Sequence, residues 1–364
     1  MCIIGLSNLE VEKMKNRFLS LILCGALSLT VLAGCNNAAV AEPETEASVA
    51  ESQVEETTTT EPEDIFGTYV ETEPLDYEKP TVDRAGNPIE VPDYAERIVS
   101  LAPSTTQFLI ELGLSDKIVG IDSNSIDYLE DLDPTIPTFD MMNPDNEAIA
   151  ALEPDIVFTS GMSYIGGESP FQPLVDAGIC VADIPSSASM EDIMLDLQFI
   201  GLCVNEPEVA DGYVESMQLM LEEIEACAAE VPARKTVLFM MSIPTADYPT
   251  IYSFGYGTYM SDMLDYIGAD NACGDLEGWV AITEEEAVAM NPDVILTNVN
   301  WVEDPAGEIM ALEGWSNVTA VKNGEVYYVD ANLCSRPNEH IANATIEWGA
   351  CVYPDQFAEL AEAI

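Results

Sequence analysis

The side chains most often used in catalysis and metal binding are few or widely scattered in this sequence. His340 is the only histidine, and a zinc or manganese site would need histidines and carboxylates in a cluster, so no metal site is expected. No C-x-x-C pair occurs, and no phosphate-binding glycine loop, G-x-S-x-G or H-E-x-x-H motif stands in the context that its chemistry requires. These observations argue against an enzyme. An exported hydrolase that uses paired carboxylates stays an alternative.

Two glutamates stand at equivalent places in a repeated pattern. Glu147 precedes Pro154 by seven residues, and Glu285 precedes Pro292 by the same interval. In both copies the glutamate opens a short helical segment, and Pro-Asp then leads into an apolar strand that contains a threonine near its end. The copies lie about 138 residues apart, which is longer than the period of any solenoid repeat. The pattern therefore predicts two lobes of similar construction.

The segments around the first copy predict an α/β fold. Residues 97–101 and 117–121 are apolar and typical of strands, and a helix is expected from Gln107 to Leu112 with a serine or threonine cap. Upstream, residues 79–92 indicate two short β segments around a turn. Because strands and helices alternate, we expect a mostly parallel sheet.

One long helix is expected between the two copies, from Glu206 to Val231. Pro207 suits its first turn. The apolar positions fall at helical spacing and predict one buried stripe. That stripe consists of Val209, Tyr213, Met217, Met220, Leu221 and Ile224. Such a helix would bridge the two lobes, although an ordinary packed helix within one domain gives the same pattern.

The first residues resemble an export signal. Lys15 and Arg17 precede an apolar run of about 16 residues, which is shorter than the ~20 residues that cross a bilayer. Small residues then lead to Cys35. From Asn36 to about Glu78 the chain is acidic and contains no lysine or arginine, so we expect an extended tether without a fold.

The charge of the chain excludes two classes of partner. It carries 66 acidic and 11 basic residues, a formal net charge of −55. Nucleic acids and anionic lipid head groups both require a cationic surface, so neither is an expected partner. Six cysteines follow Cys35 at wide spacing, several of them in apolar stretches. A domain of this size needs no disulfides, and buried free thiols are the favoured interpretation.

The sequence resembles a known family in several places. Leu32-Ala33-Gly34-Cys35 is similar to the bacterial lipobox, in which the cysteine is acylated. Beyond it, nearly all of the chain from Val82 to Phe357 resembles the substrate-binding lipoproteins of ABC importers for ferric siderophores, haem and vitamin B12. The segments that carry this resemblance are RIVSLAPSTTQFLIELGLSDKIVGID (97–122), the Pro-Asp strand (154–160), GYGTYMSDMLDYIGADNA (255–272), GWVAITEEEAVAMNPDVIL (278–296), AVKNGEVYYVD (320–330) and SRPNEHIANA (335–344).

The resemblance implies a domain organisation and a location. It implies an α/β fold of two lobes with mostly parallel sheets, bridged by one long helix, with the ligand between the lobes. Lipid would hold the protein on the outer face of the bacterial cytoplasmic membrane. The expected parts are a signal peptide (1–34), a lipid-anchored acidic tether (35–78), an N-terminal lobe (79–204), a bridging helix (205–233) and a C-terminal lobe (234–364).

Site residues follow from the same resemblance and from the rule that ligands bind at the carboxyl ends of parallel strands. Glu147 and Glu285 match the positions that dock onto arginines of the membrane permease, although glutamates at a helix start can also serve only the helix dipole. The expected ligand contacts are mostly aromatic or hydroxyl-bearing, with one cation. They are Ser104, Thr105, Met162, Tyr164, Tyr256, Trp279, Trp301 and Arg336.

The expected partners are an iron chelate, haem or a corrinoid, together with a dimeric ABC permease and its ATPase. No cofactor is expected. Because Arg336 is the one cation expected near the site, a corrinoid or a near-neutral chelate is favoured slightly over a polyanionic catecholate complex. His340 could serve haem iron as an axial ligand, but a surface or capping role is favoured. A sensor or surface-binding protein of the same fold, acting without transport, is the main alternative.

Overall fold

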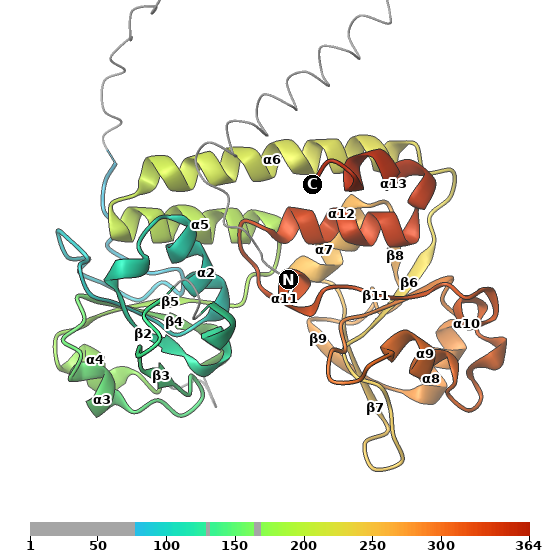
Figure 1. The fold of residues 1–364 in the computed structure, drawn as a ribbon, viewed down its shortest axis with the longest axis horizontal. Coiled ribbons are helices and arrows are strands. Elements are labelled where there is room, and N and C mark those ends of the chain that lie inside the picture. Colours follow the sequence, from blue (N-terminus) through green and yellow to red (C-terminus); the bar gives the residue numbers. More distant parts are fainter. Residues whose placement is uncertain (1–76, 129–131, 164–168) are drawn as a thin grey trace, which may run out of the picture. The chain divides into compact units, whose positions relative to one another are not determined.

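A long helix, α6 (Pro207–Ala229), connects two lobes that each contain a parallel sheet (Figure 1). The computed structural model describes residues 77–128, 132–163 and 169–364. Helix α6 has 23 residues and is therefore roughly 35 Å long, at ~1.5 Å per residue. The helix lies within the segment that the sequence predicts as the bridge, and the predicted two-lobed α/β fold class is confirmed.

The first lobe contains a five-stranded parallel sheet in the order β3-β2-β1-β4-β5. β1 occupies the centre of the sheet, and its residues Ile98, Val99 and Ser100 are all buried. The strands are β1 (Ile98–Ser100), β2 (Ile118–Asp122), β3 (Thr138–Phe139), β4 (Ile156–Ser160) and β5 (Cys180–Ile184). The helices of this lobe are α2 (Pro103–Glu111), α3 (Asn146–Ala150), α4 (Gln172–Asp176) and α5 (Met190–Val204).

The second lobe contains a four-stranded parallel sheet in the order β11-β10-β6-β8, together with an antiparallel pair of β7 and β9. Its strands are β6 (Thr236–Met240), β7 (Thr250–Phe254), β8 (Asp270–Asn271), β9 (Trp279–Thr283), β10 (Val294–Thr297) and β11 (Val326–Tyr328). Its helices are α7 (Tyr259–Tyr266), α8 (Glu284–Met290), α9 (Pro305–Met310), α10 (Thr319–Asn323), α11 (Ala331–Ser335), α12 (Ile341–Val352) and α13 (Pro354–Ala361).

Helix α2 begins earlier than the sequence predicts. The expected start was Gln107 with a serine or threonine cap, but the helix starts at Pro103 and its N-cap residue is Ala102, whose side chain makes no capping bond. Proline suits this position because its fixed φ fits the first turn and its missing N–H would have no partner there. As a consequence, Ser104 and Thr105 lie in the first turn of α2 instead of in a loop. Upstream, the two expected β segments are reduced to one bridge between Val82 and Pro88.

The internal repeat corresponds to one structural device used twice. In each lobe a short helix is followed by a residue with positive φ that directly precedes Pro-Asp: Glu153 (φ 48°), three residues after the end of α3, and Asn291 (φ 47°), the C-cap of α8. The Asp155 carboxylate accepts the backbone N–H groups of Glu96 and Arg97 at 2.9 and 2.8 Å. Asp293 accepts the N–H of Thr236 at 2.9 Å. Each aspartate therefore fastens its strand, β4 or β10, to the start of the neighbouring strand.

Helix α6 packs against both lobes, and this packing fixes how they are joined. It contacts α5 of the first lobe and α7, α12 and α13 of the second. A Cβ atom on Gly201 of α5 would lie only 2.4 Å from Cβ of Ala210, so the close approach of α5 and α6 requires glycine there. In the N-terminal half of α6 the buried stripe is shifted by one residue from the prediction, because Ala210 and Val214 are buried where Val209 and Tyr213 were expected.

Each lobe has its own hydrophobic core. The first is formed around Val99, Phe139 and Val157, and the second around Leu238, Ile295 and the fully buried Trp315. All six described cysteines are free thiols, and Cys203, Cys273 and Cys334 are buried. A search of the described ranges for a helix that could span a bilayer finds none. The predicted signal segment, Cys35 and nearly all of the acidic tether lie outside the described residues, and the exact lobe boundaries stay predictions.

The paired backbone contacts of Asp155 give a first prediction. Asp155→Ala removes the acceptor for two backbone N–H groups, so we expect it to lower the free energy of unfolding by about 1–3 kcal/mol. Chemical denaturation would measure this as a lower midpoint with an unchanged slope. The control is Asp247→Ala, in an exposed loop of the second lobe, which we expect to leave the midpoint unchanged. Equal midpoints for both variants would contradict the fastening role.

Candidate functional site

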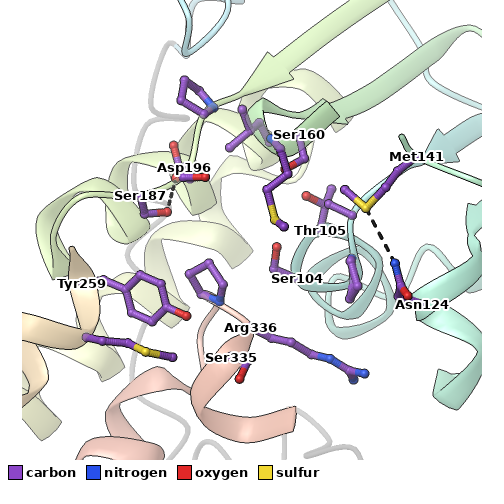
Figure 2. A pocket seen from close by; sticks show the side chains of 18 of the residues that line it. Ser104, Thr105, Asn124, Met141, Ser160, Ser187, Asp196, Tyr259, Ser335 and Arg336 are labelled. Atoms are coloured by element: carbon purple, nitrogen blue, oxygen red, sulfur yellow. Dashed lines mark hydrogen bonds between the residues drawn. The ribbon is translucent and has the colours of Figure 1, made fainter. Parts of the chain in front are cut away.

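A cavity of about 510 Å³ lies between the two lobes and is lined by both (Figure 2). Its volume falls within the range of roughly 300–1,000 Å³ that is typical of small-molecule sites. The first lobe contributes Ala102, Pro103, Ser104, Thr105, Asn124, Met141, Thr159, Ser160, Met162, Ile184, Pro185, Ser186, Ser187, Asp196, Leu197 and Ile200. The second lobe contributes Met241, Tyr259, Met260, Trp279, Ala331, Asn332, Ser335, Arg336 and Pro337.

The wall of the cavity is mostly apolar, with hydroxyl groups distributed over it. Four methionines, Met141, Met162, Met241 and Met260, contribute to it from both lobes. Methionine is flexible and polarisable, so this lining can adapt to a ligand of irregular shape. Serine and threonine hydroxyls can donate or accept hydrogen bonds and would set the orientation of such a ligand.

The positive character of the cavity comes from one side chain and one helix end. Arg336 is the one basic residue among the described residues that line it, and in Figure 2 its side chain extends toward the part of the wall where Ser104 and Asn124 lie. The first turn of α2, with Ser104 and Thr105, contains no acidic residue. Backbone N–H groups at a helix start attract negative charge. An anionic group of a ligand would therefore be favoured between Arg336 and the start of α2.

A chain of aromatic contacts positions Trp279 at the cavity. Trp348, which is fully buried, stacks on Phe254 with ring centroids 6.2 Å apart. Phe254 and Trp279 are partners in the β7–β9 pair, and their rings meet edge to face at 6.4 Å. Tyr259 contacts the Trp279 ring at 6.2 Å, and its hydroxyl donates to the carbonyl of Cys334 at 3.1 Å. Trp279 thus presents a half-exposed ring from a rigid support.

The one carboxylate of a described lining residue is already paired. Asp196, on α5, forms an ion pair with Arg84 and accepts a hydrogen bond from Ser187 at 3.0 Å. Burial raises the pKa of Asp196, while the neighbouring Arg84 guanidinium acts in the opposite direction. Asp192 extends the pair, with its Oδ1 3.3 Å from Arg84. These ion pairs hold α5 against the segment that contains Arg84. Asp196 therefore has a structural role in the cavity wall.

The structure brings five of the eight expected ligand contacts to this cavity. Two of the others, Tyr256 and Trp301, do not belong to its lining, and Trp301 is 67% exposed. Tyr164 lies outside the described residues. Ligand contact remains a prediction for all of them. The five that line the cavity are Ser104, Thr105, Met162, Trp279 and Arg336.

Sequence reasoning missed the contributions of α5, α7 and the residues that follow β5. Ser186 and Ser187 follow β5 at the carboxyl edge of the sheet, so the strand-end rule applied to every strand would have included them. Leu197 and Tyr259 lie on helices, where an apolar or aromatic residue at helical spacing looks like any core position. Their neighbours in sequence therefore did not identify either residue as part of a ligand site.

Glu147 and Glu285 are exposed side chains in the first turns of α3 and α8. Neither carboxylate forms an ion pair with a described residue. The capping of α3 is performed by Asp145, whose side chain accepts the N–H of Ala148. Helix α8 is capped by Thr283 and Glu286, which form a capping box. In Figure 1, α3 and α8 lie at the ends of their lobes remote from α6.

The chain's only histidine is outside the cavity. His340 precedes α12, and it lies beside Glu111 and Glu339 instead of among the lining residues. Burial raises the pKa of Glu339 to about 7. An axial histidine for haem is therefore not available within the described lining.

Comparisons with known proteins agree with this architecture. The model of the periplasmic binding protein family matches residues 98–333. An uncharacterized ABC transporter substrate-binding lipoprotein of Bacillus subtilis, YvrC, is 33% identical over 282 residues, covering 77% of this chain and 87% of that protein. A vitamin B12-binding protein of Yersinia pestis is 26% identical over 237 residues, covering 61% and 80%. A possible iron-binding periplasmic protein of Staphylococcus epidermidis superposes with a TM-score of 0.63 at 25% identity, over 72% of this chain and all of that one.

Proposed function

The chain belongs to the periplasmic binding protein family, and we propose that it is an extracytoplasmic lipoprotein that captures an iron complex or a corrinoid between its lobes for an ABC permease. Its relatives are substrate-binding proteins of ABC transporters and not enzymes, which confirms the prediction that the chain is not an enzyme. The observation that carries the proposal is the cavity of about 510 Å³, lined by both lobes.

The lining supports a large ligand that is mostly apolar. A small, multiply charged anion would need several donors around it and would leave much of the volume unfilled. Arg336 and the start of α2 suit a ligand with little negative charge, and the methionines and Trp279 suit a wide ring system. With no histidine among the described lining residues, a corrinoid or a near-neutral iron chelate is favoured over haem held by an axial imidazole.

The proposed location follows from the start of the chain. An apolar segment and the Leu-Ala-Gly-Cys sequence precede the acidic tether, and YvrC of Bacillus subtilis is named a lipoprotein. We place the mature protein on the outer face of the bacterial cytoplasmic membrane, with lipid at Cys35. A tether that repels anionic surfaces would hold the lobes away from the head groups and within reach of a permease.

A titration tests the proposed ligand class. Cyanocobalamin, haem and a panel of ferric siderophores would each be added to the purified protein while tryptophan fluorescence and calorimetry record binding. We expect saturable binding at one ligand per chain for one of these classes. If none of these compounds binds, the result would contradict the proposal.

Two tryptophan variants locate the bound ligand. Trp279 is 49% exposed and lines the cavity, whereas Trp301 is 67% exposed outside the lining. We expect Trp279→Ala to weaken binding about tenfold or more, since burying a large apolar side chain is worth roughly 1.5–3 kcal/mol. Trp301→Ala is the matched control and should bind like the original protein. The reverse ranking would place the ligand elsewhere.

Docking on the permease is proposed for Glu147 and Glu285. Both side chains are exposed, and neither caps its helix. Their helices, α3 and α8, lie on the same side of the molecule in Figure 1. Carboxylates in such positions can each pair with an arginine fork of a symmetric partner. The main alternative is a sensor of the same fold that never meets a permease.

Transport and binding measured together separate these cases. We expect the double variant Glu147→Ala, Glu285→Ala to lose ligand uptake in cells while the purified protein keeps its ligand affinity. The control is Glu222→Ala, which removes an exposed glutamate from α6 and should leave uptake intact. Unchanged uptake in the double variant would reject the docking role, and lost affinity would show that the glutamates act on the ligand site.

A further inference from the structure

Three potential metal ligands that are far apart in sequence meet outside the ligand cavity. Glu111 is the last residue of α2 in the first lobe, and Glu339 and His340 directly precede α12 in the second. Nε2 of His340 lies 3.2 Å from Oε1 of Glu339 and 3.7 Å from Oε1 of Glu111. One ligand atom from each residue lies within 4.8 Å of the other two. Among the described residues, this is the only cluster of three such groups.

The Glu339 carboxylate is buried without a hydrogen-bond partner. Its side chain is 2% exposed, and within the described part of the chain neither of its oxygens accepts a hydrogen bond of normal geometry. The contact with His340 is close but lacks that geometry. Burying a carboxylate without compensation is costly, so a native structure normally supplies a cation or donors. No described lysine or arginine forms an ion pair with Glu339 or Glu111, so among the described residues His340 is the only side chain that could bring positive charge to them, by taking up a proton. The oxygens of Glu339 therefore face a position where a cation would be stabilised.

The spacing of His340 from the two glutamates suits a small divalent ion. Zinc binds histidine nitrogen and carboxylate oxygen at roughly 2.0–2.2 Å, which places tetrahedral ligands roughly 3.3–3.5 Å apart. The distances from Nε2 of His340 to the two carboxylate oxygens, 3.2 and 3.7 Å, bracket that value, and one ligand atom from each of the three residues lies within 4.8 Å of the others. Two carboxylates and a neutral imidazole also balance the two charges of the ion. Since His340 and Glu111 keep some exposure, at 17% and 10%, water can reach a fourth position.

A further residue is placed to orient one of the ligands. The Tyr213 hydroxyl, on α6, lies 3.2 Å from Oε2 of Glu111, so this oxygen is occupied while Oε1 faces the imidazole. Hydrogen bonds of this kind fix the orientation of metal-binding carboxylates. Three helices, α2, α6 and α12, thus meet at the cluster.

We infer that Glu111, Glu339 and His340 form a structural site for a divalent metal ion of the zinc class, which ties α2 of the first lobe to the start of α12 in the second. The sequence gives no sign of this site, because its single histidine acquires carboxylate neighbours only through the packing of the lobes on α6. The site is separate from the transported ligand, since none of the three residues lines the cavity. The inference does not depend on the proposed transport function.

Zinc binding to the purified, untagged full-length chain tests the inference. Equilibrium dialysis with Zn²⁺ should give one ion per chain, and the thermal unfolding midpoint should rise with zinc concentration. Glu339→Gln and His340→Gln should each weaken zinc binding by at least about 100-fold, and Tyr213→Phe by roughly 10-fold. The control is Glu347→Gln, a half-buried position on α12 whose carboxylate accepts the N–H of Asp330, and it should retain zinc.

Cobalt provides a measurement on the unaltered chain, in case a variant fails to fold. Co²⁺ should give the intense visible absorption of a four-coordinate nitrogen and oxygen site, without a thiolate band in the near ultraviolet. Calcium and magnesium should not displace it. The inference would be overturned by absence of zinc binding, by a thiolate band, by displacement with calcium, or by equal loss of zinc in Glu347→Gln and Glu339→Gln. Absence of binding would mean that Glu339 is kept in place by a proton instead of a metal.

Discussion

The packing of α6 on both lobes is the constraint on which the rest of the structure depends. The helix contacts α5 on one side and α7, α12 and α13 on the other, so each lobe rests on the same rigid element. A second contact reinforces the joint, because Asp262 of α7 accepts the N–H of Met190 at the start of α5. The cavity exists only because these contacts set the two lobes facing each other.

The polar and apolar parts of the cavity have different structural origins. The start of α2 faces the cavity because β1 ends at the carboxyl edge of a parallel sheet, where backbone N–H groups are available. Trp279 faces it because an antiparallel pair and a buried aromatic stack hold its ring. Both lobes therefore offer a ligand apolar contacts together with hydrogen-bonding groups.

Features governed by local patterns were predictable, and features created by packing were not. The central strand β1, the Pro-Asp repeat and α6 follow from apolar periodicity and from proline, so their places agree with the sequence to within a few residues. The start of α2 was misplaced because the effect of Pro103 at a helix start outweighs a hydroxyl cap. The positions of Tyr259 and Asp196 in the cavity wall, and the meeting of Glu111 with His340, depend on contacts between distant helices.

The central claim is that the ligand binds between the lobes, and a crystal structure of the protein with its bound ligand tests it most directly. The account predicts ligand density in the cavity, against Trp279 on the second lobe and the first turn of α2 on the first, with Arg336 beside a negatively charged or chelating group. Ligand density on an outer surface, with the cavity filled only by water, would contradict it.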